Sequence, residues 1–156
     1  EAIIKKVTEY DPSFSIFHTP FAQATDYASL LSMDELGLLK ANLEDRDLLV
    51  EGKKLLQKSA TSTQETNDID VVFGQLLYRH FQNLRDHKRT STEKINRMVE
   101  ASMKAGALGG KINGSGGGGC MFMYAPNCAE EVADAIRREG GIPYIITVDE
   151  GTKLEQ

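Results

Sequence analysis

A glycine-rich segment from Gly106 to Gly119 is the part of the sequence whose composition most directly indicates a functional role. Eight of the 14 glycines of the chain lie in it. Glycine costs conformational entropy inside helices and strands, so such a run needs a physical reason. One reason is a loop whose backbone approaches another group closely or directs several N–H groups at an anion. The alternative is a wide hairpin connection or a flexible linker, but short apolar segments on both sides of the run disfavour a linker.

Two familiar phosphate-binding motifs do not fit this segment. Three glycines within Gly114–Gly119 have the spacing GxGxxG. That dinucleotide-binding loop must open into a helix, whereas the following Cys120–Ala125 is short and apolar, as a strand is. A Walker A loop requires Gly-Lys-Ser/Thr, but in Gly110–Ile112 the lysine is followed by isoleucine. Both motifs are therefore rejected.

Other side chains do not form a pattern of catalytic or metal-binding residues. His80 lies on the apolar side of an expected helix without a Ser or Cys nucleophile beside it, which favours a core or boundary histidine over a catalytic base. Lys111 is suited to phosphate, but on a strand it points to one face and can simply be solvated. Cys120 and Cys128 are the only cysteines; neither has a CxxC partner or a nearby histidine, so we expect reduced thiols. We expect no catalytic residue and no metal ligand in this sequence.

A locally basic region covers residues 79–97. Its positive residues are Arg79, Arg85, Lys88, Arg89, Lys94 and Arg97. A nucleic-acid interface would interleave such charges with exposed aromatic residues, which are lacking here. We expect a solvated helix face, with a contribution to the field over a nucleotide cleft as the alternative.

Helical periodicity dominates the first two-thirds of the chain. Ser32 and Glu35 have the spacing of a capping box that starts a helix running to about Lys58, with a break near Asp45 as an alternative. A polar loop is expected over residues 59–67. A second long helix should start at Asp68 or Asp70. Its apolar stripe is formed by Phe73, Leu76, Leu77, His80, Phe81 and Leu84.

A third helix and a β-hairpin are expected next. Thr90 and Glu93 have capping-box spacing, and Gly106 is suited to the left-handed position that ends a helix. Short apolar segments at residues 107–113 and 120–125 flank the turn-forming glycines. We expect them to be adjacent antiparallel strands joined by the glycine loop.

The remaining elements define the expected fold class. Asn127 should cap a helix over residues 128–139, followed by a last strand over 142–148. This order matches most of an α+β, split β-α-β (ferredoxin-like) sandwich, with a small antiparallel sheet, helices on one face and additional long helices. A fourth strand would complete it, and Ser13–Phe17, which alternates weakly, is the only internal candidate.

Composition narrows the class of protein. The chain has 156 residues, 40% of them hydrophobic and 26% charged, which fits one globular domain. A net charge of −5 gives no general attraction to nucleic acid or anionic membranes, and no apolar run is long enough to span a bilayer. The sequence starts without methionine or a signal-peptide pattern, so we expect an internal piece of a longer cytoplasmic protein.

The glycine-rich segment also resembles a known family. Gly106–Cys120, read GALGGKINGSGGGGC with a helix before it, resembles the third conserved motif of GHMP kinases. Upstream, Asn83–Asp86 and Ser91–Thr92 resemble the galactokinases of that superfamily. The similarity covers about Phe73–Val148. Weaker similarity to galactokinase-like proteins occurs at Asp11–Phe14 and Arg46–Leu48.

The resemblance implies a single GHMP-kinase-like carboxy-terminal domain over residues 1–156, with residues 1–60 as a helical lead-in. Family members carry a phosphate loop, an acidic metal ligand and, in galactokinases, a catalytic aspartate in an amino-terminal domain, and this sequence contains none of them. The implied partners are therefore the protein's own amino-terminal kinase domain and a small-molecule sugar, with neither nucleic acid nor membrane. The glycine loop would help to form the ATP and substrate cleft. Its residues are Asn113, Gly114, Ser115, Gly116, Gly117, Gly118 and Gly119.

The implied activity is transfer of the γ-phosphoryl group of ATP, with Mg²⁺, to a hydroxyl of a small metabolite, in particular C1 of a sugar. Asn83–Asp86 and Ser91 favour a galactokinase, with a heptose kinase or another GHMP kinase as the alternative. This sequence alone is expected to be inactive. From another class, a non-catalytic α+β module that binds a metabolite or a protein remains an alternative, with the glycines forming only a hairpin connection.

Overall fold

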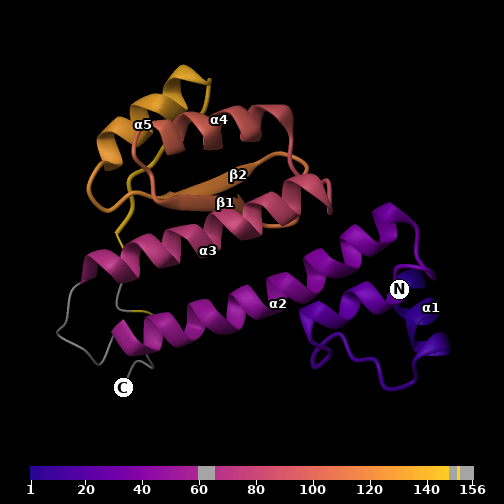
Figure 1. Ribbon diagram of the computed structural model, residues 1–156. Helices are drawn as coiled ribbons and strands as arrows, with labels where there is room; N and C mark the ends of the chain where they lie inside the picture. Colours follow the sequence, from indigo (N-terminus) through magenta and orange to yellow (C-terminus); the bar gives the residue numbers. More distant parts are fainter. Residues whose placement is uncertain (60–65, 148–150, 152–156) are drawn as a thin grey trace, which may run out of the picture.

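The computed structural model describes residues 1–59, 66–147 and 151, and combines helices with a two-stranded antiparallel sheet (Figure 1). The helices are α1 (Ala2–Tyr10), the 3-10 helix η1 (Phe21–Tyr27), α2 (Met33–Ser59), α3 (Thr66–Asp86), α4 (Glu93–Lys104) and α5 (Ala129–Arg138). The strands are β1 (Gly109–Asn113) and β2 (Cys120–Tyr124), between α4 and α5. This arrangement confirms the expected α+β class.

The amino-terminal part has a hydrophobic core of its own. Tyr27 is its central aromatic residue: its hydroxyl donates to Asp11 Oδ2 at 2.7 Å, and its ring packs edge-on against Phe14 at 5.6 Å. The expected strand over Ser13–Phe17 is wrong, because Asp11 Oδ1 accepts bonds from the Ser13 amide and hydroxyl and thereby favours a turn. The buried residues of this core are Val7, Phe14, Ala24, Tyr27, Leu31, Leu39 and Leu43.

Helix α2 begins where the capping box predicted. The Ser32 amide donates to Glu35 Oε2 at 3.0 Å, and the Glu35 amide donates to Ser32 Oγ at 3.2 Å. The helix continues through Asp45 without a break, because that side chain lies towards α3 and leaves the α2 backbone undisturbed. Of the expected loop 59–67, residues 60–65 lie outside the described residues, and α3 begins at Thr66, earlier than predicted.

Helix α3 packs along β1 at glycine contacts. A Cβ on Gly109 would lie 1.8 Å from the Gly74 carbonyl oxygen, and a Cβ on Gly74 would lie 2.4 Å from the Leu108 carbonyl oxygen. Only residues without side chains allow this approach of helix and strand backbones. Figure 1 shows α3 on one side of the sheet and α4 with α5 on the other. Helices therefore cover both faces, and the expectation of helices on one face is wrong.

The β-hairpin forms as predicted. Its register runs from Gly109 opposite Tyr124 to Asn113 opposite Cys120. The preceding turn contains Gly106 at a φ of 104°, the left-handed conformation that the sequence predicted for the end of α4. A second hydrophobic core joins the hairpin to α3 and α4. Its buried residues are Phe81, Ile95, Met98, Val99 and Ile112.

Two predicted helix caps are wrong. Thr92, not Thr90, caps α4, and its Oγ1 accepts the Ile95 amide at 3.3 Å. Thr90 is instead occupied with α3, since both its amide and its hydroxyl donate to the Leu84 carbonyl oxygen. Cys128 stands at the N-cap of α5 in place of Asn127 and makes no side-chain cap bond.

The expected strand 142–148 is not formed over its described part. Residues 142–147 follow the glycines that end α5 and have no strand partner among the described residues, while Val148 lies outside them. A strand requires a neighbouring backbone for its hydrogen bonds, and β2 is not paired with this segment. Among the described residues, no helix has the length and apolar character needed to cross a membrane.

Candidate functional site

The glycine loop connects β1 to β2 at the tip of the hairpin. Five of its residues have a positive φ, a conformation that side chains with a Cβ adopt only with strain. They are Gly114, Gly116, Gly117, Gly118 and Gly119. This explains the glycine run in conformational terms. It also confirms that the loop opens into a strand and not into a helix.

One contact ties the loop to the rest of the molecule. The Gly117 amide donates to the Thr90 carbonyl oxygen at 2.7 Å. At the neighbouring Gly116, an added Cβ would lie 2.4 Å from the same oxygen. Thr90 is in turn bonded to the Leu84 carbonyl at the end of α3. The α3–α4 connection therefore holds the middle of the loop in place.

The rest of the loop faces open space. A Cβ added at Gly114, Gly117, Gly118 or Gly119 would meet no other atom within 4 Å. Asn113 and Ser115, the polar members of the predicted site, are exposed. The loop therefore presents bare backbone that a group from outside this chain can approach without meeting side chains.

The loop also forms one end of a groove that begins at α4. Asn113, Gly118 and Gly119 line it together with Thr92 and Lys94 from the first turn of α4. The first amides of a helix and a nearby lysine favour negative charge. Thr92 already accepts the Ile95 amide, so the helix end is partly satisfied within the chain.

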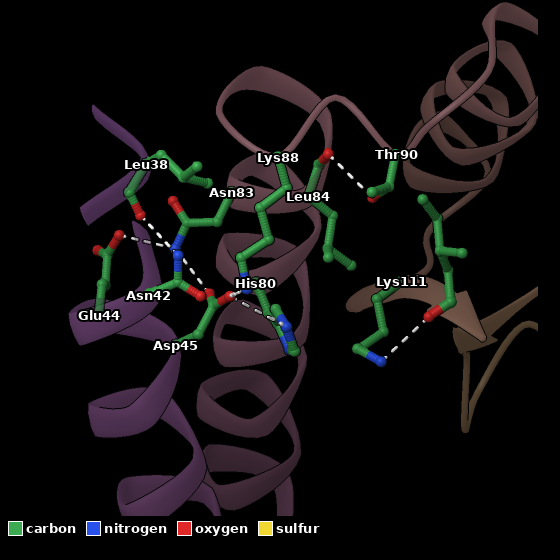
Figure 2. A network of polar contacts seen from close by, with 11 residues as sticks. Leu38, Asn42, Glu44, Asp45, His80, Asn83, Leu84, Lys88, Thr90 and Lys111 are labelled. Atoms are coloured by element: carbon green, nitrogen blue, oxygen red, sulfur yellow. Dashed lines mark hydrogen bonds and ion pairs between the residues drawn. The ribbon is translucent and has the colours of Figure 1, made fainter. Parts of the chain in front are cut away.

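A polar network lies behind β1, where α2, α3 and the strand meet (Figure 2). Asp45 from α2 is its centre, with a side chain that is only 11% exposed. Its Oδ2 forms an ion pair with Lys88 Nζ at 2.6 Å and lies 3.4 Å from His80 Nε2, which would pair with it only when His80 is protonated. Neither contact is a well-aligned hydrogen bond. Its Oδ1 accepts Asn83 Nδ2 at 2.8 Å. These contacts attach α2 to α3.

Burial changes the electrostatics of this network. It lowers the pKa of His80, and the neighbouring charges of Lys111 and Lys88 lower it further, against an opposing effect of Asp45. Burial also lowers the pKa of Lys111 from its usual value, again opposed by Asp45. Lys111 Nζ donates to the Ile112 carbonyl at 3.0 Å and lies 5.6 Å from the centre of the Phe122 ring. Lys111 thus belongs to the interior of the fold and not to the loop surface.

The structure separates these two groups of residues. Asn113 to Gly119 lie together at the tip of the hairpin, as predicted. His80 is half-buried at the boundary of the core, also as predicted, but its acidic partner Asp45 was not predicted. Lys111 is half-buried, and the prediction of a simply solvated lysine is wrong. Among the described residues, Cys120 and Cys128 are both free thiols, and burial raises the pKa of Cys128.

The basic region 79–97 is largely paired with acidic residues. Arg79 contacts Glu44 at 2.7 Å, and Arg97 contacts Glu139 at 3.1 Å. These partners lie far away in the sequence, so sequence reasoning missed both them and the Asp45 network. The only signal in the sequence was the presence of polar residues within the helices. This does not identify which of them contact each other.

Comparison with known proteins finds a matching family over residues 70–142. Residues 70–142 match the family model described as "GHMP kinases C terminal". The chain is 41% identical over 112 residues to a mevalonate kinase of Thermococcus onnurineus, covering 70% of this chain and 34% of that protein. It is 51% identical over 106 residues to a mevalonate kinase of Pyrococcus furiosus, covering 66% and 32%.

A second kind of kinase is also similar. A galactokinase of Mycobacterium tuberculosis is 33% identical over 94 residues, covering 60% of this chain and 25% of that protein. The chain thus spans about a third of the length of the first relatives it matches.

Proposed function

Residues 70–142 belong to the GHMP kinase family, and from this premise we propose that the protein containing this chain is an ATP-dependent kinase of small molecules. Its relatives named as mevalonate kinases and galactokinase support a phosphotransferase that acts on an alcohol group. One structural observation indicates which residues contribute to this function. It is the exposed glycine loop, which offers backbone without side chains to a group outside the chain.

In this proposal Asn113–Gly119 forms one wall of the cleft for ATP and the acceptor. The open positions at Gly114 and Gly117–Gly119 allow the phosphate-binding segment of an amino-terminal domain to pack directly on the loop backbone. The bond from the Gly117 amide to Thr90 holds that wall in place. Phosphoryl transfer depends mainly on positioning and on stabilisation of charge, so a rigid wall is a useful contribution.

The chain's own residues supply neither a base nor a metal site at this loop. The described residues contain no group of three His, Cys, Asp or Glu that could hold a metal ion. Because Asn113–Gly119 contains no carboxylate and no histidine, we assign the ligands of Mg²⁺ and the catalytic residues to the amino-terminal domain. ATP supplies the phosphoryl group. The loop positions that domain and excludes water from the cleft.

The acceptor is a hydroxyl group of a small metabolite, and two classes have support from separate observations. The higher identities, 41% and 51%, are with mevalonate kinases and favour a hydroxy acid. A sugar such as galactose or a heptose is supported by the resemblance of Asn83–Asp86 and Ser91 to galactokinases and by the galactokinase match at 33% identity. Asn83, which contributed to the sugar prediction, is buried. Its side-chain amide donates to Glu44 and Asp45, so Asn83 stabilises the packing of α3 on α2.

Phosphoryl transfer by the longer protein tests the proposal. We expect turnover of ATP with one acceptor from a panel of galactose, a heptose and mevalonate. Calorimetry of the 156-residue chain with ATP and Mg²⁺ should show weak binding or none, because the phosphate loop of the family is missing from it. Micromolar binding by this chain alone would contradict the placement of the nucleotide site. A longer protein that turns over no acceptor would favour the non-catalytic module.

A further inference from the structure

The segment between α3 and α4 makes a tight turn at the end of α3. The Lys88 amide donates to the Asn83 carbonyl oxygen at 3.0 Å, and the Thr90 amide donates to the Leu84 carbonyl oxygen at 2.9 Å. Between them Arg89 has a φ of 53°, and in the part of the chain that the structure describes no other residue except glycine has a positive φ. A left-handed residue of this kind often ends a helix. The turn therefore sets the direction of the Thr90 carbonyl group.

Helix α2 holds this turn through a single carboxylate (Figure 2). Asp45 Oδ2 forms an ion pair with Lys88 Nζ at 2.6 Å, and the two side chains are only 11% and 23% exposed. Asp45 Oδ1 accepts the side-chain amide of Asn83 at 2.8 Å, and the backbone of the same asparagine accepts the Lys88 amide. A Cβ added to Gly37 of α2 would lie 2.9 Å from His87 Nδ1. Helix α2 is therefore bonded to the turn and packed closely against it.

The glycine loop contacts the same turn. The Thr90 carbonyl oxygen accepts the Gly117 amide at 2.7 Å. An added Cβ at Gly116 would lie 2.4 Å from that oxygen, so the loop and the turn are in direct contact. A continuous series of contacts thus leads from Asp45 on α2, through Lys88 and Thr90, to the middle of the loop.

We propose that Asp45 is a positioning residue for the glycine loop. By holding Lys88 and Asn83, its carboxylate fixes the turn after α3, and the turn places the loop through the Thr90 carbonyl group. Helix α2 precedes residues 70–142, which match the family model, and the proposal gives this helix a function in the placement of the loop. The placement is a property of this chain, whereas its consequence for turnover rests on the proposed kinase function.

The Lys88 contact differs from other ion pairs between the same helices. A charge that is largely removed from water depends on its partner, and removal of one partner leaves the other uncompensated. The pair of Arg89 with Asp34, at 3.0 Å, is 70% and 77% exposed, and such pairs contribute little. Arg79 joins α3 to Glu44 of α2 at 2.7 Å, but it lies earlier in α3 than the turn. Lys88 is therefore the contact with α2 that should control the turn.

Amide hydrogen exchange tests the placement without any substrate. In the longer protein, free of ATP and acceptor, the Gly117 amide should exchange slowly, because it is bonded to Thr90. Lys88→Met, which retains the aliphatic part of the side chain, should speed exchange of the Gly117 and Thr90 amides roughly tenfold or more. Asp45→Asn should have the same effect in a side chain of the same shape, whose oxygen can still accept the Asn83 amide. Lys88→Arg, which keeps the positive charge, should restore slow exchange.

Two variants serve as controls. Arg79→Met removes an ion pair between the same two helices, at a side chain that is 48% exposed, and should leave exchange of the Gly117 amide within about threefold of the unsubstituted protein. Arg89→Gly places in the turn a residue that adopts a positive φ without strain, and it loses the exposed pair with Asp34. It should keep the Gly117 amide as slow as in the unsubstituted protein. The controls thus separate the Asp45 contact from general loosening of the two helices.

Turnover measures the consequence for the cleft. Lys88→Met should lower kcat of the longer protein roughly tenfold, because a displaced wall no longer holds the reacting groups in position. Lys88→Arg should restore kcat. Any fall in Tm that Arg79→Met causes should leave kcat unchanged, since that variant does not displace the loop.

Faster exchange of the Gly117 amide in Lys88→Met and Asp45→Asn, reversed in Lys88→Arg and absent in Arg79→Met, supports the proposal. Unchanged exchange in the first two variants would overturn it. An equal rise in Arg79→Met would also overturn it, because the loop would then respond to any loosening between α2 and α3. Should Lys88→Met fail to fold, the comparison of Asp45→Asn with Arg79→Met decides. Faster exchange with normal kcat would support placement of the loop by Asp45 and contradict the role of the loop in the cleft.

Discussion

Glycines occur at both ends of β1, and they are there for different physical reasons. At the start of the strand, Gly109 lies against Gly74 of α3, where an added Cβ would lie 1.8 Å from a carbonyl oxygen. Beyond the far end of the strand, in the loop, Gly117 has a φ of 77° and open space around the position of a Cβ. The first glycine is required by packing within the chain. The second allows the backbone to adopt a positive φ and leaves a surface without side chains.

The difference separates residues that hold the fold together from residues available for function. A glycine enclosed by neighbouring backbone is explained by the close packing that the stable fold requires. A glycine at the loop tip costs folding entropy. The Gly117 amide is bonded to Thr90, but the side on which a Cβ would stand makes no contact within the chain. The open positions of the loop therefore call for a partner outside the chain, which is the role assigned to the cleft wall above.

The largest effect on stability is expected for Gly109→Ala. The methyl group would force the α3 and β1 backbones apart, at a cost of about 3 kcal/mol, the upper part of the range for overpacked interiors. Urea unfolding of the 156-residue chain measures this cost. Gly52→Ala in helix α2 is the matched control. Its Cβ would lie at an ordinary contact distance of 3.8 Å from Leu76 Cδ1 of α3, and alanine within a helix should stabilise by about 0.5–1 kcal/mol. If Gly109→Ala were as stable as the unsubstituted chain, packing against α3 would not be the reason for a glycine at this position.

An intermediate effect is expected for Gly116→Ala. This position combines a φ of 87° with a Cβ that would lie 2.4 Å from the Thr90 carbonyl oxygen. We expect a loss of about 2 kcal/mol, from backbone strain together with displacement of the loop. Gly117→Ala, with a similar φ but no clash, isolates the strain. Equal losses for the two variants would show that the Thr90 contact does not hold the loop.

A smaller effect should come from the polar network behind β1. Burial lowers the pKa of His80, and Lys111 and Lys88 act in the same direction against Asp45, so the unfolded chain binds a proton more readily than the folded one. Stability is then fully present above the unfolded pKa of about 6.5 and declines as the pH falls from there towards the lower folded pKa.

Urea unfolding at roughly pH 7.5 and pH 5.5 measures this decline, and His80→Gln should reduce it. Because the network lies behind β1 and not at the loop, the pH dependence should be the same in Gly117→Ala. A decline that persists unchanged in His80→Gln would assign it to other groups.

The sequence was sufficient for elements with local signals. The Ser32–Glu35 capping box, the hairpin over 109–124 and the left-handed Gly106 all depend on residues within a few positions of each other. The α+β class followed from the order of these elements. The predicted loop residues, Asn113 to Gly119, do lie together, because they are contiguous in the chain.

Predictions failed where distant partners decide the structure. Thr90 has the spacing of a cap, yet it binds Leu84 and the glycine loop, so Thr92 takes the cap position. The strand predicted over 142–148 lacks a neighbouring backbone in its described part. The Asp45 network joins residues 35 to 66 positions apart, and no local pattern marks such a contact.

Turnover of the longer protein carrying Gly117→Val tests the central claim most directly. A β-branched residue at this φ costs about 1–3 kcal/mol in strain, which a folded domain can tolerate. It also obstructs approach to the loop backbone, and displacement of the phosphate-binding segment by about 1 Å should reduce turnover roughly a hundredfold. We predict that loss with a modest fall in Tm. Near-normal turnover, or a protein that simply unfolds, would contradict a role of the loop in the cleft.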